Sequence, residues 1–181
     1  MTQWQTFARR IRVPLGFAFA LFYIWQAEPT WQSLKVGGAL IIFGLAIRAS
    51  AAGHVLKDRE LTVTGPYAYT RHPLYLGSLI TAAGFAVAAR NEWIALAMVL
   101  LFIAIYLPVI RLEEYYLHGA FRDDFDNYAQ HVPMLVPRLT AFQHGGAFSV
   151  RRYWFNREYN AFIGAVLLVA VLFLKLGFLQ H

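Results

Sequence analysis

The stretch from Gly65 to Gly77, GPYAYTRHPLYLG, places groups that can bind charged ligands directly before an apolar run. Arg71 supplies a permanent cation, and His72 supplies an imidazole ring. Pro73 prevents His72 from being helical. Tyrosines of the same stretch can present ring faces to a cation, and they are Tyr67, Tyr69 and Tyr75. For this stretch by itself an interfacial anchor is the favoured interpretation, because basic and aromatic residues are common where spans enter the membrane. A binding site at the mouth of a membrane segment is indicated only together with a second group of charged residues.

A carboxylate pair, Glu113 and Glu114, follows another apolar run. Both residues lie one helical turn before Leu117, so both carboxylates are expected on the packed side of a helix. Carboxylates in such a place are costly unless a cation meets them. Arg71 and His72 are the natural partners within the chain, and a cationic ligand is the alternative.

Five apolar runs must position these groups. A membrane-spanning helix needs about 20 residues, and flanking Arg, Lys, Trp and Tyr side chains can extend a shorter run to the interface. The runs are Val13–Ala27, Trp31–Ile47, Leu74–Ala89, Trp93–Ile110 and Tyr159–Leu174. Because backbone groups in hydrocarbon must be satisfied within the segment, the runs predict helices.

Residues 111–129 are predicted to form one further helix outside the membrane. Its apolar residues recur at helical spacing on one face, and they are Leu117, Phe121, Phe125 and Tyr128. We therefore expect an all-α fold, an integral membrane bundle of about five spans with one cytoplasmic amphipathic helix. Residues 1–181 are treated as a single domain, in which about 55–139 carry the motifs and 159–179 form an extra C-terminal span.

The composition supports a membrane protein and excludes several chemistries. The chain is 59% hydrophobic and only 14% charged, whereas soluble domains carry about 25% charged residues. The absence of cysteine excludes disulfides, a thiolate nucleophile and a Cys-bound metal. The His residues show no i, i+4 pair, so no metal site is expected.

The basic residues are distributed unevenly along the chain. With the N-terminus in the cytoplasm, 13 of the 16 Lys and Arg residues fall on the cytoplasmic side, and the exceptions are Lys35, Arg90 and Lys175. This asymmetry follows the positive-inside rule and accounts for the net charge of +6 without nucleic acid. It also places the segments 48–73 and 111–158, which carry the motifs, on the same cytoplasmic face.

The two motifs resemble those of the isoprenylcysteine carboxyl methyltransferase and phospholipid methyltransferase superfamily. The first reads LTVTGPYAYTRHPLY and is followed by eight residues and Gly84, and the second reads RLEEYYLHGAFRDDFDNYAQHVPMLVPRL. The resemblance implies an integral membrane enzyme that uses S-adenosylmethionine. Its acceptor would be lipophilic, such as an isoprenylcysteine-like carboxylate or a lipid amine or thiol.

The resemblance also implies which residues bind the cofactor. They are Glu60, Leu61, Thr62, Tyr67, His72, Pro73, Leu74, Tyr75, Glu113 and Glu114. Arg71 and Arg111 each precede one of the motifs at the expected membrane exit, and we predict that they are the catalytic residues, with at least Arg71 orienting the acceptor by a forked contact.

The chain departs from the family pattern in three places. The strip RELTVT stands where a His often begins the family's sequence. Arg122 replaces the Gly that usually follows Phe121. The segment Tyr159–His181 extends beyond the family's usual end near Pro137. These departures affect the adenosine-side lid and the substrate entry, not the core motif.

Two other functions remain alternatives. Membrane sterol-type reductases have a similar helical module that binds NADPH, although they are much longer. A non-catalytic lipid-binding membrane protein of the same fold would have no need of both motifs. Under the preferred interpretation the partners are membrane lipid and a small lipophilic acceptor that enters laterally from the bilayer, with neither nucleic acid nor metal.

Overall fold

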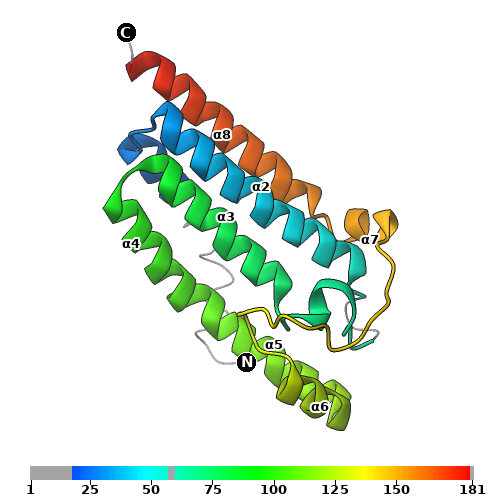
Figure 1. Ribbon diagram of the computed structural model, residues 1–181. Helices are drawn as coiled ribbons and strands as arrows, with labels where there is room; N and C mark the ends of the chain where they lie inside the picture. The colour runs from blue at the N-terminus through cyan, green and yellow to red at the C-terminus, as the bar shows by residue number, and fades with distance from the viewer. Residues whose placement is uncertain (1–17, 57–59, 180–181) are drawn as a thin grey trace.

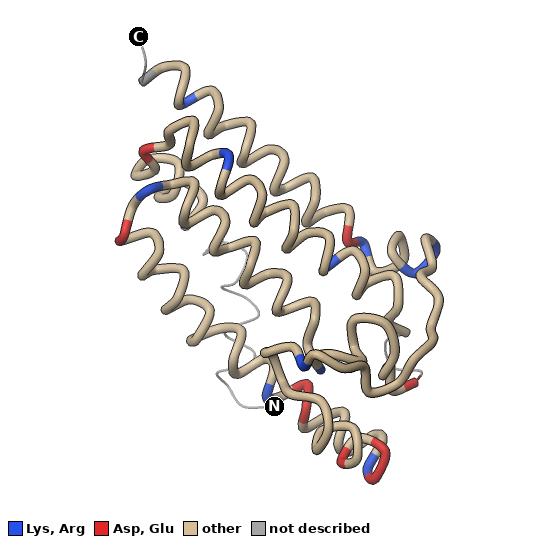
Figure 2. The backbone as a smooth tube through the Cα atoms, in the orientation of Figure 1, with Lys and Arg blue, Asp and Glu red and all other residues tan. Residues whose placement is uncertain are grey.

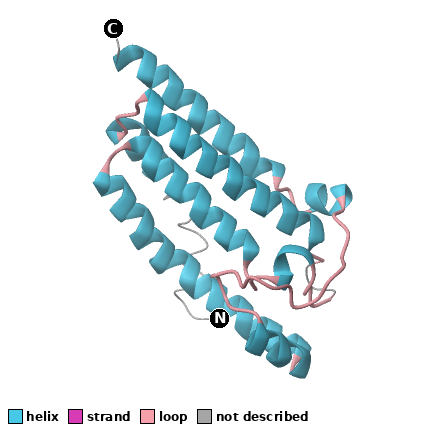
Figure 3. Cartoon of the chain, in the orientation of Figure 1, coloured by secondary structure: helices cyan, strands magenta, loops and turns pink. Residues whose placement is uncertain are grey.

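The computed structural model describes residues 18–56 and 60–179, and these residues form helices and loops without a strand (Figure 3). The expected all-α class is confirmed. After a helix at residues 18–26, the elements are α2 (Trp31–His54), the 3-10 turn η1 (Gly65–Ala68), α3 (Pro73–Ala89), α4 (Glu92–Leu101), the π-helical turn η2 (Phe102–Tyr106), α5 (Leu107–Phe121), α6 (Asp123–His131), α7 (Val150–Phe155) and α8 (Tyr159–Leu179).

Four long helices lie side by side in the order α8, α2, α3, α4 (Figure 1). Among the described residues, three helices are long and apolar enough to cross a membrane, and they are Trp31–His54, Glu92–Phe121 and Tyr159–Phe178. α3 is a shorter apolar helix packed between them. The protein is therefore an integral membrane helical bundle. α5 and α6 continue past one end of this bundle, and the loop after α6 crosses the same end to reach α7 (Figure 1).

The helices agree with the expected spans in place and differ in length. α2 continues past Ile47 to His54, and the fourth run continues without a break from Glu92 to Phe121. The first expected span, Val13–Ala27, is described only from residue 18 onward, so its beginning lies outside the described residues. Charged positions gather mainly toward the two ends of the bundle and on α5 to α7 (Figure 2).

Glycines allow α2 and α3 to approach closely. A Cβ atom at Gly37 would lie 2.5 Å from the carbonyl oxygen of Gly84, and one at Gly44 would lie 2.6 Å from that of Gly77. Membrane helices associate through such close packing of small residues. The glycine that ends the first motif, Gly84, therefore fixes α3 against α2.

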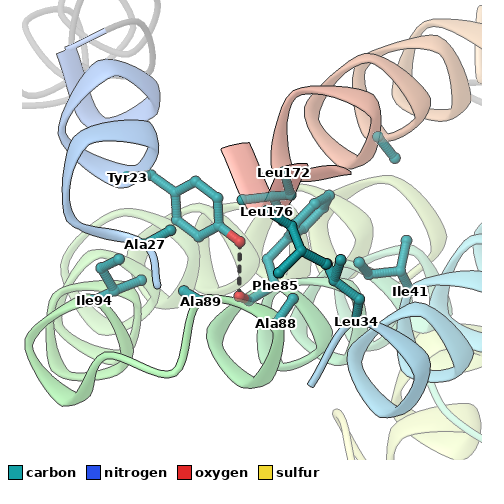
Figure 4. Packing of buried hydrophobic residues seen from close by; sticks show 11 residues of the cluster. Tyr23, Ala27, Leu34, Ile41, Phe85, Ala88, Ala89, Ile94, Leu172 and Leu176 are labelled. Atoms are coloured by element: carbon teal, nitrogen blue, oxygen red, sulfur yellow. Dashed lines mark hydrogen bonds between the residues drawn. The ribbon is translucent and has the colours of Figure 1, made fainter. Parts of the chain in front are cut away.

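A hydrophobic cluster joins the helices at the end opposite α5 (Figure 4). Tyr23, which is 1% exposed, donates its hydroxyl hydrogen bond to the carbonyl oxygen of Phe85 at 2.9 Å. Ile94 of α4 and Leu172 of α8 belong to the same cluster. The residues 18–26 are thus anchored to α3 by a polar bond inside an apolar cluster.

The single helix expected over 111–129 is interrupted, so that prediction was wrong. α5 ends at Phe121 and α6 begins at Asp123, because Arg122 adopts φ 44° and ψ −116°. This left-handed backbone is disfavoured for residues with a side chain. The predicted apolar stripe is nevertheless brought together in one cluster, whose members include Leu117, Phe121, Phe125 and Tyr128.

Candidate active site

His72 directly precedes α3 and caps it without being helical. Its φ is −125° and its ψ is 60°, while Pro73 occupies the first turn of the helix. This geometry follows from the local sequence, because a proline disfavours helical dihedral angles in the preceding residue. His72 is only 4% exposed, so its ring is held at a fixed place at the start of α3.

Arg71 and His72 both bind Glu114 of α5. Arg71 Nε donates to Glu114 Oε1 at 2.7 Å, and His72 Nε2 lies 3.2 Å from the same oxygen. Because a carboxylate oxygen only accepts, His72 Nε2 is the nitrogen that carries the proton. The side chains of Arg71 and Glu114 are 12% and 18% exposed, respectively. Arg71 and His72, the partners expected within the chain, thus both bind Glu114, one of the two carboxylates.

Arg71 also binds the C-terminal end of α6. Its Nη1 donates to the carbonyl oxygens of Ala129 at 2.9 Å and Val132 at 2.6 Å. Carbonyls in the last turn of a helix have no partner within the helix, so such donors satisfy them. The guanidinium is therefore held by three protein oxygens, and a contact of Arg71 with an acceptor stays a prediction.

Glu113 has different surroundings from its neighbour. Its side chain is 45% exposed, and Glu113 Oε2 lies 4.0 Å from His72 Nδ1. Only Glu114 lies on the packed side, whereas both carboxylates had been expected there. Glu114 thus joins α5 to the first motif, whereas Glu113 faces a cavity.

That cavity has a volume of about 200 Å³ and lies between the end of α2, residues 60–67, and α5. Its polar lining comes from Glu60, Thr62, Tyr67, Arg71, Glu113, Tyr116 and Tyr128. Its apolar lining comes from Val55, Leu56, Leu61, Leu117, Ala120 and Phe121. Such a surface can hold an apolar ring at one side and charged groups at the other.

Two buried tyrosines form the inner side of the cavity. The hydroxyl of Tyr128 donates to the carbonyl oxygen of Tyr67 at 2.7 Å. Burial raises the pKa of both phenols well above the usual range, and the nearby carboxylate of Glu113 raises the pKa of Tyr67 further. Both side chains therefore remain neutral at physiological pH.

Tyr75 lies between His72 and Tyr106. Its ring centroid is 5.7 Å from that of His72 and 5.9 Å from that of Tyr106, and the two tyrosine rings meet at 78°. Tyr106 ends the π-helical turn η2, and such turns occur often at functional sites. The motifs did not predict Tyr106. Pro108, which lies inside the apolar run, is a signal that could have found this irregular turn.

Of the other predicted residues, some line the cavity and some belong to the helix that begins beside it. Glu60, Leu61 and Thr62 line the cavity. Pro73 and Leu74 form the first turn of α3, where the Leu74 carbonyl oxygen lies 3.4 Å from Arg48 Nη1.

Tyr69 and Arg111 neither line the cavity nor take part in the hydrogen bonds to Glu114 described above. Tyr69 is 38% exposed, and Arg111 is exposed on α5 one turn before Glu114. Among the residues described, there is no group of three or more His, Asp and Glu that could hold a metal ion.

Comparison with known proteins identifies the class. Residues 32–124, just over half of the 181-residue chain, match the family described as phospholipid methyltransferase. The membrane bundle and this match define an integral membrane protein of the methyltransferase class. The chain belongs to the phospholipid methyltransferase family. The resemblance seen in its motifs is thereby confirmed.

Three relatives illustrate the similarity. The nickel-cobalt-cadmium resistance protein NccN of Alcaligenes xylosoxydans xylosoxydans is 30% identical over 137 residues, which cover 71% of this chain and 64% of NccN. The cobalt-zinc-cadmium resistance protein CzcN of Cupriavidus metallidurans is 32% identical over 149 residues, which cover 77% and 68%. The protein-S-isoprenylcysteine O-methyltransferase B of Arabidopsis thaliana is 34% identical over 119 residues, which cover 59% and 60%. The chain thus spans about two thirds of the first two relatives. No solved structure matches it.

Proposed function

We propose that this chain transfers a methyl group from S-adenosylmethionine to a small lipophilic acceptor at the membrane interface. The observation that carries the proposal is the placement of Glu113, Tyr67 and Arg71 around one cavity at the polar end of the bundle. The family match supports methyl transfer as the class of reaction.

The residues around the cavity fit the groups of S-adenosylmethionine. The exposed carboxylate of Glu113 suits the ammonium or the ribose hydroxyls. The ring of Tyr67 suits a sulfonium, because aromatic faces attract cations. Leu61 and Leu117 provide apolar surface for the adenine ring. When bound, S-adenosylmethionine would supply an activated methyl group: the acceptor's lone pair would form the new bond to the methyl carbon, and the electrons of the broken S–CH3 bond would stay on sulfur.

We assign the remaining residues by their contacts. Glu114 is a positioning residue, because it holds Arg71 and His72 at the edge of the cavity. His72 also lies beside Glu113, with 4.0 Å between Nδ1 and Oε2. Arg71 and Arg111 orient the polar head of the acceptor, Arg71 from the cavity wall and Arg111 from the exposed side of α5. Methyl transfer needs this alignment and the exclusion of water more than proton chemistry.

The acceptor is proposed to be an isoprenylcysteine-like carboxylate or a lipid amine or thiol that enters from the bilayer. The Arabidopsis relative is named as an isoprenylcysteine O-methyltransferase, which favours the carboxylate. A carboxylate acceptor needs no proton removal, whereas an amine or a thiol must lose a proton.

The active site is proposed to face the cytoplasm, as the basic asymmetry predicts. This cysteine-free chain allows a direct test, because single cysteines can be placed at the exposed positions Leu139 and Glu92. An impermeant thiol reagent should label the two from opposite sides of the membrane. Labelling of both from one side would overturn the orientation.

Binding and turnover test the proposed function. Calorimetry on the detergent-solubilised chain should detect S-adenosylmethionine and not NADPH, and Glu113→Gln should weaken binding while Glu92→Gln, a change at the far end of the bundle, should not. Membranes supplied with methyl-labelled S-adenosylmethionine should label a lipophilic product. Binding of NADPH alone would favour a reductase, and binding of neither would leave a non-catalytic protein of this fold.

A further inference from the structure

α7 lies at the end of the bundle where α2 ends and α8 begins (Figure 1). Phe155, its last residue, precedes Tyr159 of α8 by four positions, and α8 is long and apolar enough to cross a membrane. Four residues reach at most about 14 Å. A hydrogen bond from the backbone nitrogen of Glu158 to the carbonyl oxygen of Tyr153 also folds this link back. α7 is therefore held in the interfacial layer of the bilayer.

One face of α7 is bound to the end of α2. Arg152 Nη1 donates to the carbonyl oxygen of His54 at 3.0 Å. Asn156 Nδ2, just after α7, donates to the carbonyl oxygen of Ala52 at 2.9 Å. Carbonyl groups in the last turn of a helix have no partner within that helix, so these bonds satisfy the end of α2 and fix the orientation of α7.

The other face of α7 is exposed and combines aromatic rings with a cation. At 3.6 residues per turn, Arg151 and Phe155 lie one turn apart on the same side, and Trp154 lies beside them. Phe155 is 83% exposed and Trp154 is 58% exposed, and Arg151 is exposed as well. Aromatic residues are enriched where a protein meets the membrane–water interface, so this face suits the surface of a bilayer.

The cations of this face have no acidic partner in the part of the chain that the structure describes. Arg151 and Arg157, which is exposed just after α7, form no ion pair with a described carboxylate. The neighbouring Glu158 is 8% exposed, and its carboxylate accepts from Arg48 Nε at 2.5 Å and from Arg48 Nη2 at 3.0 Å. Because Arg48 of α2 offsets the charge of Glu158, positive charge remains on α7 (Figure 2).

We propose that this face of α7 binds the headgroups of anionic phospholipids. Guanidinium groups such as those of Arg151 and Arg157 bind phosphate through two parallel hydrogen bonds. Trp154 and Phe155 suit the boundary between headgroups and acyl chains. A second copy of the chain is a poorer occupant, because a symmetric contact would place arginines opposite arginines. The inference does not depend on methyl transfer, and α7 lies outside the segment 32–124 that matches the family.

The first test measures the Tm of the full chain in dodecyl maltoside as phosphatidylglycerol is added. A ligand that binds only the folded protein raises the Tm as its concentration rises. Arg157→Gln and Arg122→Gln form a matched pair, because both arginines are exposed and both have a left-handed backbone, with φ 53° and 44°. Arg122 lies between α5 and α6, which extend past the bundle (Figure 1).

Each basic residue near an anionic surface is worth roughly fivefold in affinity. Arg157→Gln should therefore need about fivefold more phosphatidylglycerol for the same rise in Tm, and Arg151→Gln/Arg157→Gln about 10–30-fold more, while Arg122→Gln behaves as wild type. Phosphatidylcholine should not distinguish the variants, and about 1 M NaCl should remove most of the difference, because exposed charges are screened. Equal responses of the wild type to both lipids, or equal phosphatidylglycerol responses of the wild type and the double variant, would overturn the proposal.

The second test locates α7 relative to the bilayer. Phe155→Cys and, as a control, Asn127→Cys at an exposed position of α6 each give this cysteine-free chain one thiol for the fluorophore NBD. The labelled chain is reconstituted in vesicles of equal parts phosphatidylcholine and phosphatidylglycerol. Doxyl-labelled lipid in these vesicles should quench NBD at position 155 and not at position 127. Absence of quenching at position 155 would place this face in water or against protein, and would overturn the proposal.

Discussion

Replacing Glu113 and Glu114 by glutamine, one at a time, should distinguish the carboxylate that binds the cofactor from the carboxylate that stabilises the fold. Glu114→Gln removes the charge that binds Arg71 Nε at 2.7 Å and His72 Nε2 at 3.2 Å. Glu113→Gln removes a carboxylate that is 45% exposed and faces the cavity. The two variants have the same chemistry at consecutive positions of one helix, so each is the control of the other.

The magnitudes follow from the surroundings of each carboxylate. Hydrogen bonds to charged groups are worth about 1.5–3 kcal/mol each, and glutamine at position 114 keeps part of this bonding. We therefore expect Glu114→Gln to lower the free energy of unfolding by about 2–3 kcal/mol, or the Tm by about 4–12 °C for a chain of this length. Glu113→Gln should cost less than about 1 kcal/mol of stability, because an exposed charge contributes little. Its loss should instead weaken S-adenosylmethionine binding about 10–100-fold.

Differential scanning fluorimetry and calorimetry of both variants in the same detergent provide the measurement. The expected pattern is a lowered Tm for Glu114→Gln and a lowered affinity at normal Tm for Glu113→Gln. The reverse pattern, or an unchanged affinity in Glu113→Gln, would refute the division of roles between the two residues.

Other consequences are open to direct measurement. Arg71→Lys should reduce kcat/KM for methyl transfer about tenfold or more, because an ammonium cannot reproduce the forked contact; normal turnover per folded molecule with only a lowered Tm would leave Arg71 a structural anchor. Arg122→Gly should raise the Tm by relieving a backbone strain of about 1–3 kcal/mol at φ 44°, and a lowered Tm would contradict this account. Gly44→Val should destabilise the bundle by about 1–3 kcal/mol or more, since its Cβ would collide with α3. Gly38→Val, with nothing within 4 Å, should be tolerated, and equal effects of the two valines would count against the proposed packing.

Local features of the structure were predictable from the sequence because their causes are local. Pro73 forces His72 out of the helix by a clash between adjacent residues, and the structure places His72 in front of α3. Helical spans follow from apolar runs, because hydrocarbon offers no partner for the backbone. Arg71 was also foreseen as a candidate partner of the carboxylate pair, because a carboxylate beside a membrane segment requires a cation, and the structure pairs it with Glu114.

The break at Arg122 shows where local reasoning failed. The apolar residues on both sides of Arg122 keep helical spacing across positions 117–128, so the pattern predicted one helix. Arg122 hid the turn, because its residue type does not mark the left-handed backbone that the position adopts. Phe125 and Tyr128 of α6 pack in one cluster with Leu61 and Val63 of the segment before α3, and this tertiary packing overrides the local backbone preference of Arg122.

The sequence by itself determined the helical membrane bundle, the two motifs and the chemistry of their side chains. Only the tertiary structure decided that Glu114 is bound while Glu113 faces the cavity, that Tyr106 contacts Tyr75, and that Arg48 joins α8 through Glu158. In a membrane helix most faces are apolar, so hydrophobic periodicity does not show which face meets which neighbour. Those contacts depend on the rotation of each helix, which the π-helical turn η2 and the close α2–α3 packing set across residues distant in the chain.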